Sequence, residues 1–464
     1  MSKLKTIQGI PAAAPASRRH NFAAASVGLC AACVFMLAGC SRGKEAPMHL
    51  MGAYRYPDGR LVSIRASTDG TLRYTEYATG ESRRLHPAGE LRYEAGPGFV
   101  GKEPVEVTAE FRLGENGAAE SVAISFNGEP PATLELVSRE RWVTFFSGEV
   151  ELRGRIDLPP GPGPFPAVVF AHGSGKDPAT EFMFPGDFYS QNGIAALTFD
   201  KRGTGRSEGE FTMDFHELAK DIAAAVEFLA TRPEIDRGRI GISGYSQGGW
   251  IGPLAASMSP RVKWVIVNYG MIESPAYEAR METIELLKTR GVEGDDLAKA
   301  DEVTVAAVDL VAAGFRGGWK EFGAAREKFR DEPWMKQFEG SPVGYLLKYP
   351  RWLVRLAGPR MLPPGLTWQY ESTAVLDTLD LPMAWLLGEM DRGAPNEKTI
   401  ETLQRLMAAG KPYELVIFPD ADHGMIEFRE EADGSRVPLK YSTDFFTTQV
   451  FYARKFCGME AGDR

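Results

Sequence analysis

From residue 165 onward, short apolar runs alternate with longer stretches in which apolar residues recur at helical spacing. The apolar runs are typical of buried strands and lie at residues 165–171, 239–243, 262–268, 381–387 and 413–418. The helical stretches lie at residues 214–231, 248–258, 276–289, 295–313 and 319–329. Strands that alternate with helices predict an α/β fold, with a mostly parallel central sheet flanked by helices.

The segment before this region follows a different pattern. Alternating polar and apolar positions, as in residues 61–65, 72–77 and 105–108, predict half-buried strands. Hairpin turns separate them, at Asp58-Gly59, Asp69-Gly70, Asn116-Gly117 and Asn127-Gly128. We therefore expect a small antiparallel β domain, a sandwich or an open barrel, within residues 40–141, and we expect the α/β domain to occupy residues 142–464.

The long interval between the runs 262–268 and 381–387 carries helical stretches and many aromatic residues. Because an apolar strand pattern returns only at residue 381, these helices read as an insertion into the α/β domain. We predict a helical insertion over about residues 271–365. Aromatic side chains at helical spacing usually belong to a core, and a few are expected to face a substrate and to favour an apolar acyl or aryl group.

The first 39 residues predict an export signal. Four basic residues and no acidic ones accompany an apolar run at 22–37 that ends in Leu37-Ala38-Gly39-Cys40. This ending resembles the bacterial lipoprotein box, which implies cleavage before Cys40, acylation of its sulfur and location in the bacterial cell envelope, at the outer membrane or the periplasmic face. An uncleaved membrane anchor is the alternative, although the run is short for a spanning helix.

Composition limits the partners. Loss of residues 1–39 changes the net charge from −9 to −13, which argues against nucleic acid or an anionic surface as a partner. Of the four cysteines, only Cys457 would stay unmodified, so no disulfide within one mature chain is expected.

The pattern Gly-x-Ser-x-Gly occurs three times, around Ser41, Ser207 and Ser246. Only Ser246 has an apolar strand before it and a helical stretch directly after it. A strand, a sharp turn and a helix form a nucleophile elbow, which raises the serine hydroxyl above the sheet edge. Ser41 lies in the export segment, and Ser207 is expected to be a loop serine.

A serine nucleophile needs a base and an acid that orients the base. His423 is the one histidine after Ser246, and it follows the strand at 413–418. Asp391 follows the buried strand at 381–387 and is the expected acid, with Glu389 as its near competitor. Asp422 is adjacent to His423, and neighbouring side chains on an extended loop point apart.

The tetrahedral intermediate of acyl transfer also needs hydrogen-bond donors for its oxyanion. The expected donors are the backbone N–H groups of Gln247, directly after the nucleophile, and of Ser174, in the loop His172-Gly173-Ser174-Gly175. His172 is interpreted as a ring that braces this loop. The glycine-rich stretch 200–207 lacks a following Gly-Lys-Ser/Thr and is interpreted as a structural loop in which Asp200 and Arg202 brace the strand end.

Five motifs in this order resemble the signature of bacterial alpha/beta hydrolases, especially carboxylesterases that border the dienelactone hydrolase and prolyl-oligopeptidase-like groups. They are residues 172–175, 200–207, 244–250, 388–391 and 422–424. The resemblance covers about residues 142–456 and implies an alpha/beta-hydrolase fold with esterase chemistry on a small-molecule ester and no cofactor. Because these enzymes carry a helical cap inserted after the sixth strand, the resemblance also implies that residues 271–365 form such a cap. A peptidase or an acyltransferase would use the same residues, and a non-enzymatic binding lipoprotein would keep only the fold.

Overall fold

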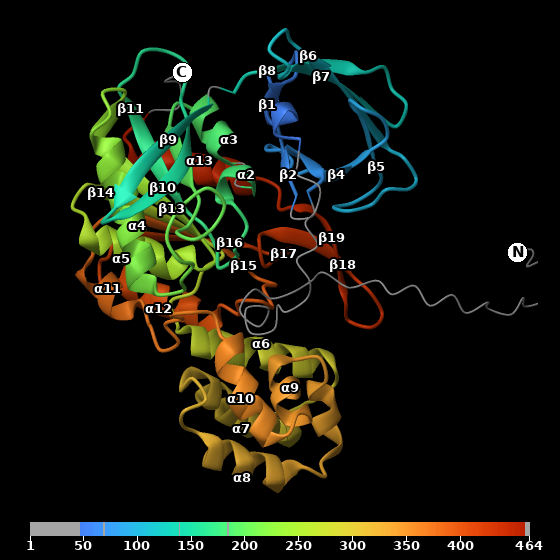
Figure 1. Ribbon diagram of the computed structural model, residues 1–464, viewed down its shortest axis with the longest axis vertical. Helices are drawn as coiled ribbons and strands as arrows, with labels where there is room; N and C mark the ends of the chain where they lie inside the picture. Colours follow the sequence, from blue (N-terminus) through green and yellow to red (C-terminus); the bar gives the residue numbers. More distant parts are fainter. Residues whose placement is uncertain (1–46, 68–69, 139, 183–184, 460–464) are drawn as a thin grey trace, which may run out of the picture.

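The computed structural model describes residues 47–67, 70–138, 140–182 and 185–459 (Figure 1). Cys40 and the predicted export signal lie outside these residues. Within the described part of the chain, no helix is long and apolar enough to cross a membrane.

The N-terminal strands form a closed barrel, drawn in blue and cyan in Figure 1. A short 3₁₀ turn, η1 (Met48–Leu50), leads into β1 (Gly52–Arg55), β2 (Leu61–Ala66), β3 (Leu72–Glu76), β4 (Ser82–Pro87), β5 (Arg92–Ala95), β6 (Val107–Leu113), β7 (Ala119–Phe126) and β8 (Ala132–Leu136). Each strand pairs with the next, and β1 also pairs with β8 through Tyr54 and Leu136. The expected antiparallel β domain is confirmed, but it is neither a sandwich nor an open barrel, because this last pairing closes the sheet.

The second part of the chain builds an eight-stranded mixed sheet. Its strands are β9 (Glu140–Ser147), β10 (Val150–Asp157), β11 (Phe165–Ala171), β12 (Ala195–Phe199), β13 (Ile235–Tyr245), β14 (Val262–Asn268), β15 (Met383–Gly388) and β16 (Tyr413–Phe418). They lie in the order β16-β15-β14-β13-β11-β12-β10-β9. Strands β11 to β16 pair in parallel, whereas β10 pairs antiparallel with both β12 and β9. The predicted α/β-hydrolase fold is confirmed.

Helices cover both faces of this sheet. Side chains of α4 (Phe215–Ala230), α5 (Gly248–Met258), α11 (Thr373–Thr378) and α12 (Glu397–Ala408) share one buried apolar cluster with the sheet. Side chains of α3 (Pro185–Gln191) and α13 (Phe445–Phe456) belong to the cluster on the opposite face. A short helix, α2 (Ala179–Phe182), precedes α3. Sheets of this kind place functional groups at the carboxyl ends of their parallel strands.

Between β14 and β15 the chain leaves the sheet and forms a helical unit with its own apolar core, at the bottom of Figure 1. It consists of α6 (Pro275–Thr289), α7 (Gly294–Ala312), α8 (Trp319–Phe329), the 3₁₀ helix η2 (Pro333–Phe338), α9 (Pro342–Lys348) and α10 (Arg351–Met361). Four aromatic side chains of this insertion, Phe322, Trp334, Phe338 and Trp368, are buried in that core, whereas Tyr349 and Trp352 are exposed. We call this unit the cap.

A three-stranded sheet after β16 was not anticipated from the sequence. It consists of β17 (Ala421–Asp422), β18 (Ile426–Glu430) and β19 (Arg436–Tyr441). The backbone N–H of Tyr441 donates to the carbonyl of Gly80 at 2.9 Å, and that of Phe99 donates to the carbonyl of Pro438 at 3.3 Å. This small sheet therefore joins the barrel to the loop that carries His423.

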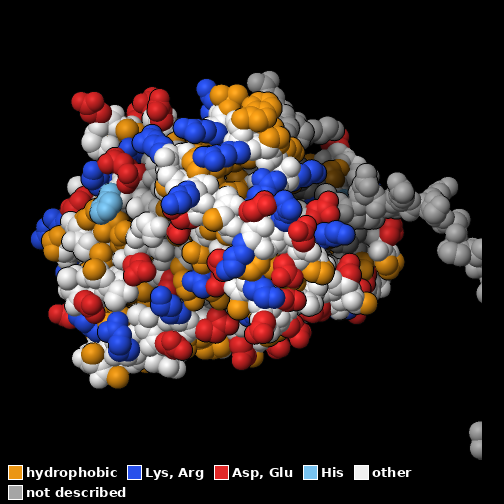
Figure 2. Space-filling view, turned by 90° about the horizontal axis from the view of Figure 1, so that it is seen from below, with side chains coloured by type: hydrophobic (Ala, Val, Ile, Leu, Met, Phe, Trp, Pro, Cys, Tyr) orange, Lys and Arg blue, Asp and Glu red, His pale blue; other side chains and the backbone are white. Residues whose placement is uncertain are grey.

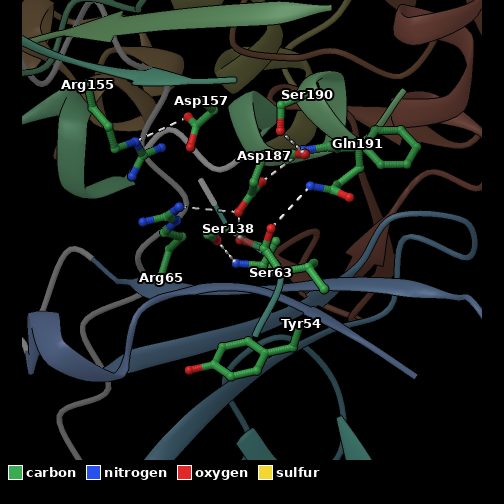
Figure 3. Close-up of polar contacts among 12 residues, drawn as sticks. Tyr54, Ser63, Arg65, Ser138, Arg155, Asp157, Asp187, Ser190 and Gln191 are labelled. Atoms are coloured by element: carbon green, nitrogen blue, oxygen red, sulfur yellow. Dashed lines mark hydrogen bonds and ion pairs between the residues drawn. The ribbon is translucent and has the colours of Figure 1, made fainter. Parts of the chain in front are cut away.

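A second contact between the barrel and the α/β domain is polar and buried (Figure 3). Asp187 of α3 is 1% exposed. It accepts hydrogen bonds from the Ser63 hydroxyl at 3.2 Å, from Arg65 at 3.3 Å and from the Tyr77 hydroxyl. A buried carboxylate is stable only when charge and hydrogen bonds compensate its lost hydration, and here barrel residues supply that compensation.

Candidate active site

Ser246 lies in a sharp turn between β13 and α5. Its φ of 52° falls in the left-handed region, which costs energy for a residue with a Cβ atom. The neighbouring glycines make this turn possible. A Cβ atom on Gly244 would lie 2.4 Å from the carbonyl oxygen of Gly248, and one on Gly248 would lie 2.4 Å from that of Ala171. The strand–turn–helix arrangement expected from the sequence is therefore present.

The structure brings Ser246, His423 and Asp391 together at the carboxyl edge of the sheet. His423 Nε2 lies 3.2 Å from Ser246 Oγ, and His423 Nδ1 lies 3.0 Å from Asp391 Oδ2. Ser246 is 8% exposed and Asp391 is 6% exposed, whereas the His423 side chain keeps some solvent contact. Three loops, after β13, β15 and β16, thus supply one continuous chain of hydrogen bonds.

The two competing carboxylates lie elsewhere. Glu389 is exposed and has no contact with the His423 ring among the hydrogen bonds of the described residues. Asp422 accepts the backbone N–H groups of His423 and Arg392 and forms an ion pair with Arg436 at 2.7 Å. Asp422 therefore fixes the backbone of the histidine loop, while Asp391 contacts the ring.

The orientation of Asp391 is itself fixed. Its Oδ1 accepts the backbone N–H of Ala394 at 2.7 Å, which leaves Oδ2 for the histidine. The two loops are also tied to each other, because the N–H of Met390 donates to the carbonyl of Ala421 at 3.1 Å. The distance between acid and histidine is therefore set by backbone contacts.

The electrostatics of His423 follow from its neighbours. Burial lowers its pKa, but the negative charge and hydrogen bond of Asp391, with the charges of Glu278 and Asp422, outweigh burial and raise the pKa to about 9. Glu278 lies in the first turn of α6 and is 3% exposed. The cap thus adds a negative charge to the site that the sequence analysis did not identify.

Ser174 and Gln247 lie as expected, on the loop after β11 and at the start of α5. Among the described residues, neither of their backbone N–H groups donates to a protein acceptor. Both residues are nearly buried, at 3% and 2% exposed. Two backbone donors near the nucleophile are therefore left for a substrate oxygen.

Lys201 connects these two donor segments, and the sequence analysis missed it. Its ammonium donates to the carbonyl oxygens of Gly173 and Gly175 and, at 3.0 Å, to the side-chain oxygen of Gln247. Lys201 is 3% exposed, so these contacts are made out of water. The available signal was a lysine two residues after the buried strand β12, at the same sheet edge as the nucleophile.

His172 braces the same loop, as interpreted from the sequence. Its Nδ1 lies 3.2 Å from the carbonyl oxygen of Gly173. Burial and then the positive charge of Lys201 hold the pKa of His172 well below its usual value, so the ring stays neutral.

Ser207 and Arg202 make contacts outside the site formed by Ser246, His423 and Asp391. The hydroxyl of Ser207 donates to the carbonyl of Asp200 at 2.6 Å and accepts the N–H of Arg153, so it is a loop residue. Arg202 does not brace the strand end but pairs with Asp221 and Glu217 of α4. No cluster of three or more potential metal ligands occurs in the described ranges.

Comparisons with known proteins agree with this geometry. A model described as the alpha/beta hydrolase family matches residues 168–433. The chain is 35% identical over 127 residues to thiohydrolase aneE of Aspergillus aculeatus, over 27% of this chain and 39% of that protein. It is 33% identical over 116 residues to esterase EstD of Thermotoga maritima, over 23% of this chain and 28% of that protein.

A further relative is the uncharacterized protein PA2218 of Pseudomonas aeruginosa, 23% identical over 280 residues, which are 55% of this chain and 66% of that protein. Its crystal structure is similar with a TM-score of 0.41 and 20% identity, and the similarity covers 69% of this chain and 94% of that one. The chain spans 25% to 39% of the length of the first curated relatives it matches. Because the family match covers more than half of the chain and includes Ser246, Asp391 and His423, this protein belongs to the alpha/beta hydrolase family.

Proposed function

We propose that the protein is a serine hydrolase that cleaves carboxylic esters of small to medium size with apolar acyl or aryl groups. The observation that carries this proposal is the hydrogen-bonded chain from Ser246 through His423 to Asp391, beside two unused backbone N–H groups. The relative named as an esterase supports the reaction class. Ser246 is the proposed nucleophile, His423 the base and Asp391 the orienting acid.

The proposed reaction has two halves. The Ser246 hydroxyl attacks the ester carbonyl as its proton moves to His423 Nε2, and Asp391 stabilises the imidazolium that forms. The oxyanion accepts hydrogen bonds from the N–H groups of Gln247 and Ser174. When the carbon–oxygen bond breaks, His423 protonates the departing alcohol. Water then attacks the acyl-enzyme with His423 as base again, and release of the carboxylic acid restores Ser246.

Thioesters are the second candidate substrate class. The specific observation in their favour is the similarity to two proteins named as thiohydrolases, at 35% and 40% identity over short segments. The same residues would serve, because a thioester differs only in its leaving group. Peptide cleavage or acyl transfer would also need no other nucleophile.

For location, we propose export to the bacterial cell envelope with a lipid on Cys40. The support is the sequence of residues 1–40 alone, and the proposed partner is then the membrane that holds the lipid.

The decisive experiment labels the protein with a fluorophosphonate, which reacts with an activated serine. Ser246→Ala should remove labelling and ester turnover while the thermal unfolding temperature is retained. Ser207→Ala is the matched control and should keep both, since Ser207 lies in the second Gly-x-Ser-x-Gly match. Labelling that survives in Ser246→Ala would refute the proposal. A series of p-nitrophenyl esters of rising acyl length, run beside matched thioesters and aminoacyl anilides, then separates the substrate classes.

A further inference from the structure

One stretch of the cap reverses the charge of the chain. The protein as a whole has a net charge of −9, but residues 340–370 contain no aspartate or glutamate. The same stretch carries four basic residues, Lys348, Arg351, Arg355 and Arg360, all of them exposed. Positive charge is therefore concentrated on α10, which carries three of these residues, and on Lys348 at the end of α9.

The same helix exposes large apolar side chains. Trp352 is 68% exposed and Leu356 is 59% exposed, and they lie one helical turn apart on one face of α10. Tyr349, just before the helix, is 40% exposed and stacks on Tyr345. Adjacent exposed apolar side chains of this size mark an interaction surface more often than single ones do.

The opposite face of α10 packs against the rest of the cap. Val354 and Gly358 are its buried positions. A Cβ atom on Gly358 would lie 2.8 Å from the Phe315 ring, so the glycine allows close packing there. The exposed face is therefore held outward by a well-packed inner face.

The basic side chains on this face are not neutralised by the protein. Arg351 lies 5.2 Å above the Trp319 ring, and Arg360 donates to the carbonyl of Leu356. No carboxylate in the described part of the chain forms an ion pair with any of the four cations. By contrast, Arg330 on the neighbouring connection pairs with Glu327 and Asp331. Figure 2, which looks at the molecule from the cap side, shows basic and hydrophobic side chains side by side, with acidic side chains among them.

We propose that α10 docks the protein on an anionic phospholipid surface. Trp352 and Leu356 would enter the headgroup region, and Arg351, Arg355 and Arg360 would contact lipid phosphates on either side of them. A helix that lies in the plane of a membrane has this arrangement, an apolar row with tryptophan flanked by basic residues. The net negative charge of the remaining chain would repel the same surface, which favours an approach by this face.

The docking is independent of acylation at Cys40 and of the hydrolase reaction. The net charge of −9 argued against an anionic surface as a partner. That value describes the whole chain, whereas residues 340–370 contain no acidic residue. The consequence is a fixed orientation of the molecule, with the cap toward the lipid.

The test uses the full chain with Cys40→Ala, so that no acyl group contributes, and vesicles of phosphatidylglycerol and phosphatidylcholine in equal amounts. Sedimentation should show vesicle binding that weakens at 0.5 M salt and is at least tenfold weaker on pure phosphatidylcholine. Trp352→Ser combined with Leu356→Ser should weaken binding at least tenfold. Arg355→Gln should weaken it about fivefold, the equivalent of about 1 kcal/mol per basic residue near the surface. Phe451→Ser is the matched control, because Phe451 is 58% exposed on α13, and it should change nothing.

Hydrogen–deuterium exchange locates the docking surface along the chain. Addition of vesicles should slow amide exchange in residues 345–361 and leave other segments unchanged. Thermal unfolding of each variant must match the parent chain, which excludes misfolding as the cause. Three results would overturn the proposal: equal binding to both vesicle types, equal weakening by Phe451→Ser, or protection elsewhere but not on α10. A concentration-dependent dimer that Trp352→Ser abolishes would equally overturn it and would assign the face to a second copy of this chain.

Discussion

Replacement of Asp391 by asparagine isolates the role of one charge in the proposed mechanism. Ala394 N–H donates to Oδ1, so the asparagine should place its oxygen there and its NH₂ group where Oδ2 was, facing His423. An NH₂ group donates, so Nδ1 must accept and the imidazole proton moves to Nε2. That nitrogen lies 3.2 Å from Ser246 Oγ and can then no longer take its proton. We expect kcat to fall by about 10⁴, or about 5 kcal/mol in the activation barrier.

The pH profile gives a second and independent signature. Only neutral His423 can act as base, so its raised pKa predicts that activity increases with pH and levels off above about pH 9. In Asp391→Asn the largest cause of the raised pKa is gone and burial lowers it. The residual activity should therefore level off at a lower pH than that of the parent protein.

The assay is steady-state hydrolysis of a p-nitrophenyl ester from pH 5 to 10, corrected with Ser246→Ala for spontaneous hydrolysis. Glu389→Gln is the matched control, because it removes a carboxylate two residues away that is exposed, and it should keep normal turnover. The reasoning fails if Asp391→Asn retains near-normal turnover, or if its profile keeps a midpoint near pH 9. Loss of activity in Glu389→Gln with retention in Asp391→Asn would move the acid to Glu389.

Three further predictions concern the surroundings of the site. Lys201→Met should lower kcat by about 10² with little change in KM, because the loop of Ser174 loses its link to Gln247; a loss confined to KM would contradict this. Asp187→Asn should lower the free energy of unfolding by about 3 kcal/mol in urea titration, since it removes the charge from a buried carboxylate that pairs with Arg65, whereas the same change at exposed Asp331 should have no measurable effect. Cys40→Ala should release the protein from the detergent-extracted membrane fraction, and a mature N-terminus elsewhere, found by mass spectrometry, would refute the proposed processing.

The reactive residues could be predicted because their signals are local. Ser246 is recognised from one strand, one turn and one helix within about twenty residues. His423 and Asp391 each follow an apolar strand, and parallel strands bring their carboxyl ends to one edge. Chain order indicated His423, and the position after a strand favoured Asp391 over its competitor Glu389. The structure places His423 within hydrogen-bond distance of both Ser246 and Asp391.

Features that depend on distant pairings could not be predicted in the same way. The acceptors of Lys201 come from two loops, 26 to 46 residues away, and no pattern around Lys201 indicates them. Closure of the barrel needs β1 to find β8, a pairing of Tyr54 with Leu136 that an alternating pattern does not specify. The hairpin of β18 and β19 is short and half exposed, so its apolar signal is weak.

The contact between Asp187 and the barrel constrains the order in which the molecule can mature. Ser63, Arg65 and Tyr77 precede Asp187 by 110 to 124 residues, so they leave the ribosome, or a translocation pore, well before their acceptor does. The barrel strands can pair in that interval, but the side that faces α3 must remain hydrated until Asp187 arrives. Attachment of the barrel through this contact can therefore occur only after α3 has been synthesised.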